Sequence, residues 1–141
     1  MSDSQRQMKQ ALRDIVLPML RQSGFVGSLP HLRRLRGGKV DLMTFQFDKY
    51  GGGFLIEIGQ CDPDGFTTPD GQLIPLEKMN VQYLRWDRRT RIKQHEGSGT
   101  DSWFRYDRGG DSYSGTATAV LPFLEKLDSF YEGLARPGSP A

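Results

Sequence analysis

Two clusters of glycine divide the first half of the chain and limit the folds it can adopt. Gly37-Gly38 and Gly51-Gly52-Gly53 separate short runs in which residues alternate with the period of two that is typical of β-strands. These runs cover residues 32–36, 40–47 and 54–58. Glycine adopts positive φ at little cost, so both clusters favour tight turns. The sequence therefore predicts three consecutive strands in an antiparallel meander. The middle strand is apolar on both sides, which is typical of a central or covered strand.

A helical pattern precedes these strands. Seven apolar residues recur at the i, i+3, i+4 spacing of one helix face: Met8, Ala11, Leu12, Ile15, Val16, Met19 and Leu20. Pro18 lies within this pattern, and because proline has no N–H to donate, we expect the helix to bend or break near residue 14. Gly24 is positioned to end it.

A second helical pattern follows the strands, over residues 116–134. Thr116 or Thr118 is the expected N-cap, which would put Pro122 near the first turn, where its missing donor matters least. Between the meander and this helix, residues 61–80 are rich in Pro, Asp and Gly and predict an irregular excursion with turns.

Two further strands are expected, over residues 81–93 and 102–106. The order of helix, strands and helix predicts the α+β class, with N-terminal and C-terminal helices packed on one face of an antiparallel sheet of about four to six strands. The length of 141 residues suits one domain, assigned to residues 1–136, followed by a flexible tail over 137–141.

Composition narrows the class of protein. Hydrophobic residues make up 36% of the chain, and a domain of this length buries enough surface to need neither a metal nor a disulfide. Cys61 is the single cysteine, which suits a reducing cytoplasm. The N-terminal segment lacks the apolar core of a signal peptide, and no apolar run approaches the length of a membrane span. We therefore expect a cytoplasmic protein with no membrane partner; its oligomeric state is left open.

Several short motifs together resemble a known family. They are Gly24-Phe25, Phe45-Gln46, Gly59, Arg91-Ile92 and Trp103-Phe104, spread from about Leu12 to the segment VLPFLE. With the segments around them, these motifs resemble the bacterial domain-of-unknown-function 4304 family. Lys93 stands where the family tends to have glycine, and Phe104 where it tends to have a second tryptophan. The resemblance implies a small α+β cytoplasmic protein and brings no catalytic residues.

The sequence offers weak support for catalysis by a nucleophile or a metal. Cys61 with His31 or His95 is the only conceivable Cys–His set, and Cys61 is expected to be a small residue at a sheet edge. Two histidines without further ligands at recognisable spacing do not predict a zinc site, so we expect neither metal nor cofactor.

The acidic and glycine-rich segments only superficially resemble calcium-binding and phosphate-binding loops. Residues 62–71 lack the ligand spacing of a calcium loop and predict two turns instead. The triple glycine does not open a helix, as a phosphate-binding loop would. Glu57 with Asp41 or Asp48 is the one candidate acid pair for a hydrolase. Gln46 is expected to satisfy a buried main-chain group.

The most informative cluster joins arginines to aromatic residues. Its candidate binding residues are Arg85, Arg88, Arg89, Arg91, Trp103, Arg105 and Tyr106. If both segments are strands, these side chains share a surface suited to a protein partner, since Trp, Tyr and Arg dominate interface hot spots. Such a surface is also able to stack single-stranded bases and neutralise phosphates. In the purely structural alternative, Trp86 and Trp103 cover the sheet and the arginines pair with Asp87, Asp101 and Asp107.

Charge favours the protein partner. The chain has a net charge of only +2, and residues 85–108 contribute +3 from seven Lys or Arg and four acids. A dedicated nucleic-acid binder has a more concentrated basic surface. The leading hypothesis is a non-enzymatic protein-binding module with an immunity-like or regulatory role. Single-stranded nucleic-acid binding is the alternative, and a hydrolase with an acidic site around Glu57 is the second.

Overall fold

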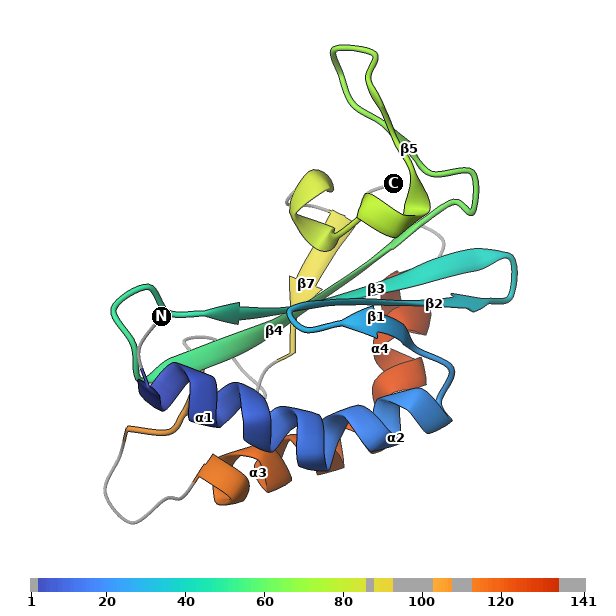
Figure 1. Cartoon of the computed structure of the whole chain (residues 1–141). Helices are drawn as coiled ribbons and strands as arrows, with labels where there is room; N and C mark the ends of the chain where they lie inside the picture. The colour runs from blue at the N-terminus through green and yellow to red at the C-terminus, as the bar shows by residue number, and fades with distance from the viewer. Residues whose placement is uncertain (1–2, 86–87, 93–102, 108–112, 135–141) are drawn as a thin grey trace.

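The fold consists of a sheet with all of its long helices on one side. A computed structural model describes residues 3–85, 88–92, 103–107 and 113–134. Figure 1 shows the helices below the sheet: α1 (Asp3–Ala11), α2 (Leu17–Gln22), α3 (Tyr113–Glu125) and α4 (Leu127–Leu134). The α+β class and the one-sided helix layer are therefore as predicted.

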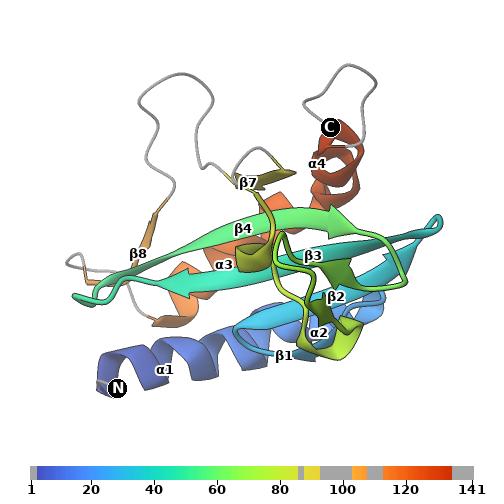
Figure 2. The same cartoon turned by 90° about the horizontal axis from the view of Figure 1, so that it is seen from above.

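Among the described residues, six strands form the main sheet. They are β1 (Val26–Ser28), β2 (His31–Arg36), β3 (Lys39–Phe47), β4 (Gly53–Cys61), β7 (Arg89–Arg91) and β8 (Phe104–Arg105). The order is β1-β2-β3-β4-β7, every pairing is antiparallel, and β8 also pairs with β4. The predicted meander is thus confirmed as β2, β3 and β4. Figure 2 shows β7 on the outer side of β4, away from β3.

The predicted strand over residues 81–93 is wrong for most of its length. Residues Val81–Tyr83 form a 3-10 turn, η3, and only Arg89–Arg91 form a strand among the residues described here. The Asn80 side chain accepts a hydrogen bond from the amide of Gln82 at 2.9 Å, which starts the turn. For residues 102–106, the strand is confirmed at Phe104–Arg105; residue 102 lies outside the described residues.

The excursion between β4 and β7 covers part of the second sheet face. It contains a small hairpin, β5 (Phe66–Thr67) with β6 (Leu73–Ile74), and a 3-10 turn, η2 (Leu76–Lys78), before η3. Its apolar side chains form a second core with those of β3 and β4: Val40, Leu42, Cys61, Ile74, Met79, Val81 and Leu84. The middle strand is therefore covered on both sides, as its apolar pattern predicts.

Proline shapes both helical segments. Pro18 follows a π-helical turn, η1 (Leu12–Val16), which confirms the disruption expected near residue 14. Because Pro18 cannot donate to the carbonyl four residues before it, the helix widens there. The prediction for Pro122 is wrong, since α3 begins at Tyr113 and places this proline in its interior.

The start of α3 was predicted wrongly because the two threonines expected to cap the helix make other hydrogen bonds. The Thr116 hydroxyl donates to the carbonyl of Arg105 at 3.1 Å, so it ties the helix to the sheet instead of starting it. The Thr118 hydroxyl donates to the carbonyl of Ser114 at 2.7 Å, one turn back within the same helix.

A carboxylate is fully buried between the sheet and the helices. Asp41 has no exposed surface, and it accepts hydrogen bonds from Arg34 at 2.8 and 3.0 Å, from Arg36 at 2.9 Å and from Gln60 at 2.8 Å. Arg34 lies opposite Asp41 on β2, and Gln60 lies opposite it on β4. The carboxylate therefore connects three neighbouring strands.

Arg34 extends this network to the helices. Its guanidinium donates to the carbonyl of Ser23 at 3.2 Å and to Asp128 of α4 at 3.0 Å. The same group lies 4.6 Å from the ring centre of Phe25 and 5.6 Å from that of Tyr131. The Tyr131 hydroxyl donates to the carbonyl of Leu42 at 2.7 Å. One buried arginine thus joins the end of α2, the sheet and α4.

We predict that Asp41→Ala lowers the free energy of unfolding by about 3–5 kcal/mol, because it removes the buried counter-charge of Arg34 and leaves only the exposed Asp128 to pair with it. Asp62→Ala is the control: it removes an exposed pair with Lys39 and costs less than about 1 kcal/mol. Urea unfolding followed by circular dichroism measures both. Equal losses in the two variants would contradict a structural role for the buried network.

Candidate protein-interaction site

Strands β7 and β8 lie end to end along one edge of β4. Arg91 stands opposite Glu57, Arg89 opposite Gly59, and Arg105 opposite Gly53. Side chains directly opposite one another share a face, and alternate residues of β4 point to the same side. Arg89, Arg91 and Arg105 therefore project from the sheet face away from the helices, so the structure brings together three of the predicted binding residues.

The neighbouring candidates lie at the margin of this surface. Arg85 and Arg88 are exposed in the segment that leads into β7, and Trp103 is half-buried immediately before β8. The guanidinium of Arg105 lies 5.5 Å from the ring centre of Trp103, within cation–π range. We call Arg85, Arg88, Arg89, Arg91, Trp103 and Arg105 the arginine surface.

Tyr106 is not on the arginine surface, which corrects its assignment as a binding residue. It is 6% exposed and packs in the helix-side core, with its ring centre 5.9 Å from that of Tyr113. It follows Phe104 by two residues, and Phe104 is itself buried on that side. Burial also raises the pKa of the Tyr106 hydroxyl.

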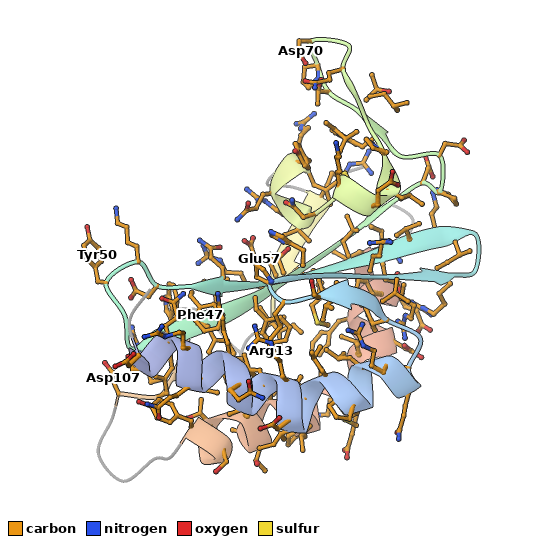
Figure 3. The ribbon with its side chains drawn as sticks, in the orientation of Figure 1. Arg13, Phe47, Tyr50, Glu57, Asp70 and Asp107 are labelled. Atoms are coloured by element: carbon orange, nitrogen blue, oxygen red, sulfur yellow. The ribbon has the colours of Figure 1, made fainter. Side chains whose placement is uncertain are left out.

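Carboxylates lie among the arginines. Glu57 is 7% exposed and its Oε2 lies 3.8 Å from Nε of Arg89. Asp48 lies 3.9 Å from Nη1 of Arg105. Figure 3 shows Glu57 on the side of the sheet away from α1, whereas Phe47 points toward the helices. Part of the positive charge of the surface is thus balanced at short range.

Glu57 belongs to a row of polar side chains that crosses four strands. The register aligns His31 of β2, Thr44 of β3, Glu57 of β4 and Arg91 of β7. Nδ1 of His31 lies 3.0 Å from the Thr44 hydroxyl, and burial lowers the pKa of this imidazole. Sequence reasoning missed this row because alternation assigns each residue to a face but does not tell which residues of separate strands stand opposite one another.

The acid pair proposed for a hydrolase does not form. Asp41 faces the helices, whereas Glu57 faces the opposite side of the sheet. Asp48 shares the face of Glu57, but it lies four residues beyond Thr44, the partner of Glu57, which is about 13 Å along the strand. No two of these three carboxylates converge on a common point.

The other chemical candidates are also separated. Cys61 stands opposite Val40 at the far end of β4, while His31 lies two strands away opposite Thr44; His95 lies outside the described residues. Within the described ranges, no three His, Cys, Asp or Glu side chains gather in a way that would hold a metal ion. Residues 62–71 form turns, with the Gly65 amide donating to Asp62 and the Gly71 amide to Thr68.

The sequence matches the model of one protein family. The family model described as Domain of unknown function (DUF4304) matches residues 7–127, which is most of the chain, so the protein belongs to this family. No curated protein and no solved structure shows significant similarity to the chain. In the part of the chain that the structure describes, no helix is long and apolar enough to cross a membrane.

We predict that the Cys61 thiol reacts slowly. Burial raises its pKa to about 11, so at pH 8 the thiolate is roughly a hundredfold scarcer than in a free cysteine. Reaction with a chromogenic disulfide at pH 8 is expected to be slower by at least that factor and to accelerate as the pH rises toward 11. Protein unfolded in urea provides the control and reacts at the ordinary rate. Fast reaction of the folded protein at pH 8 would contradict a buried thiol.

Proposed function

We propose that this protein is a non-enzymatic, cytoplasmic protein-binding module that contacts its partner through the arginine surface. The observation that carries the proposal is the grouping of Arg89, Arg91 and Arg105 with Trp103 along one edge and face of the sheet. Arginine and tryptophan are the residues most enriched at interface hot spots, because each combines a large contact area with directional polar groups. The cytoplasmic assignment is supported by the single, buried thiol.

Electrostatics favours a protein over a nucleic acid as the partner. Glu57 and Asp48 lie within 4 Å of Arg89 and Arg105, so the surface carries both signs of charge. A surface that binds the phosphate backbone gains most of its affinity from arginines and lysines that release counterions. Carboxylates inside the patch oppose that gain, whereas they supply hydrogen-bond acceptors for the mixed polar rim of a protein interface.

A module of this kind acts by occupying a surface of its partner. This mode suits an immunity-like or regulatory protein, which inhibits or adjusts another protein without chemistry of its own. The separation of Glu57, Asp41 and Asp48 supports this proposal over a hydrolase.

The test is affinity capture with a matched pair of double variants. Arg88→Glu plus Trp103→Ala alters the arginine surface, and Arg13→Glu plus Tyr50→Ala changes an arginine and an aromatic residue at exposed positions elsewhere. Tagged protein is incubated with a lysate of the source organism, bound proteins are identified by mass spectrometry, and the interaction is repeated with purified partner. Loss of a hot spot is expected to weaken binding by at least about 30-fold in the first variant only.

Two outcomes would contradict the proposal. One is an identical set of captured proteins for the wild type and both variants. The other is tight binding of single-stranded DNA or RNA that falls steeply with salt and is lost in the first variant, which would identify the surface as a nucleic-acid interface.

A further inference from the structure

In the described part of the chain, the main sheet ends with β1 on one side and with β7 and β8 on the other, and β1 and β7 differ in how their outer edges are satisfied. Along a strand of an antiparallel sheet, the N–H and C=O groups of one residue bond to the neighbouring strand and those of the next residue point to the other side. The outer edge of a terminal strand is therefore a row of unpaired N–H and C=O groups unless something covers it.

The β1 edge is closed by an arginine. The Pro30 carbonyl accepts a hydrogen bond from the amide of Phe45, so the main-chain groups of Leu32, two residues later, also point toward β3. Gly27 lies opposite Leu32, and its main-chain groups therefore point outward from β1. The Arg21 guanidinium donates to the carbonyl of Gly27 at 2.6 Å and to that of Phe25 at 3.2 Å. Arg21 thus occupies the acceptors that another strand would need.

The β7 edge has no such cover among the described residues. The Ile92 amide donates to the carbonyl of Ile56 at 2.8 Å. Because the direction alternates along the strand, the main-chain groups of Thr90, opposite Ile58, also point toward β4. The main-chain groups of Arg89 and Arg91 therefore point away from β4. No group in the described part of the chain pairs with them.

The arginine side chains at this edge disfavour pairing with a second copy of β7 and favour pairing with an acidic strand. Arg91 is exposed, Arg89 is half-buried, and exposed Arg88 precedes them. A second copy of the same edge would bring arginine against arginine, and like charges directly opposite one another destabilise strand pairing. A carboxylate placed outside Arg91 would instead continue the row of Glu57 and Arg91 with a further opposite charge.

We propose that the outer edge of β7 binds an extended acidic segment of a partner protein by strand addition. The main-chain groups of Arg89 and Arg91 pair with the added strand, and the exposed guanidinium of Arg91 selects a carboxylate beside it, since the Arg89 guanidinium is already held by Glu57 and by the Val81 carbonyl at 3.4 Å. This mode gives affinity through main-chain hydrogen bonds and specificity through every second side chain. The inference rests on the proposed protein-binding function and names the chemistry of its partner.

The test measures fluorescence anisotropy of a labelled peptide of about ten residues, long enough for one strand, that alternates Glu and Thr. We expect saturable binding to the full chain. Arg89→Gln plus Arg91→Gln is expected to weaken it by at least about tenfold, because the charge-assisted contact of Arg91 and the positive charge of Arg89 at this edge are both lost. Arg13→Gln plus Arg33→Gln, on the first helical segment and on β2, is the matched control and leaves the affinity unchanged; circular dichroism verifies that both variants fold.

A second peptide separates strand addition from simple charge attraction. It has the same sequence but carries N-methyl groups at alternate residues, which removes the donors along one edge and keeps every carboxylate. We expect it to bind at least about tenfold more weakly, since each lost main-chain hydrogen bond reduces the affinity. Equal binding of the two peptides would overturn strand addition, as would equal binding by the wild type and the Arg89→Gln plus Arg91→Gln variant.

The captured partner distinguishes failure of this inference from failure of the proposed function. If the acidic peptide displaces the partner, strand addition at β7 is supported. If the partner is lost in the Arg88→Glu plus Trp103→Ala variant but is not displaced by the peptide, the protein-binding function stands and strand addition is wrong.

Discussion

The buried carboxylate of Asp41 is the constraint on which the rest of the fold depends. A charge without exposed surface is tolerated only when every acceptor position is satisfied, and here Arg34, Arg36 and Gln60 together supply four hydrogen bonds. These donors come from the strands on either side of β3. A slip of one residue in either pairing would turn Asp41 to the opposite face and leave its partners behind. The network thus fixes the register of β2, β3 and β4, and β4 is the strand with which β7 and β8 pair.

The same network makes the molecule asymmetric. Arg34 connects the sheet to the end of α2 and to α4, so the helices are held on one face. Arg21, near the end of α2, then reaches the outer edge of β1 and closes it. Figure 2 shows β7 at the other side of the sheet, beyond β4. The helices therefore cover one face and Arg21 closes one edge, whereas the arginines of β7 and β8 lie at the other edge, on the face that the excursion covers only in part.

Features that depend on local sequence could be predicted, and those that depend on pairing could not. The glycine clusters and the period of two predict β2 to β4, and Pro18 predicts the break in the first helix, because each is a property of neighbouring residues. Arg89, Arg91 and Arg105 share one face of the sheet because β7 and β8 pair with the same strand. Tyr106 was assigned to the surface because alternation does not tell which face is covered. Whether the main-chain groups of Arg89 and Arg91 point outward depends on which residues of β7 hydrogen-bond to β4. The sequence does not reveal this, because the two strands lie about 30 residues apart in the chain.

The central claim is that β7 is an available sheet edge, and amide hydrogen exchange measured residue by residue tests it most directly. The account predicts alternation in the free protein: the amides of Thr90 and Ile92, which face β4, exchange slowly, and those of Arg89 and Arg91 exchange at least about tenfold faster. The two fast amides become protected when the partner binds. Slow exchange at all four positions in the free protein would show that the outer groups of β7 are already bonded, and it would contradict the account.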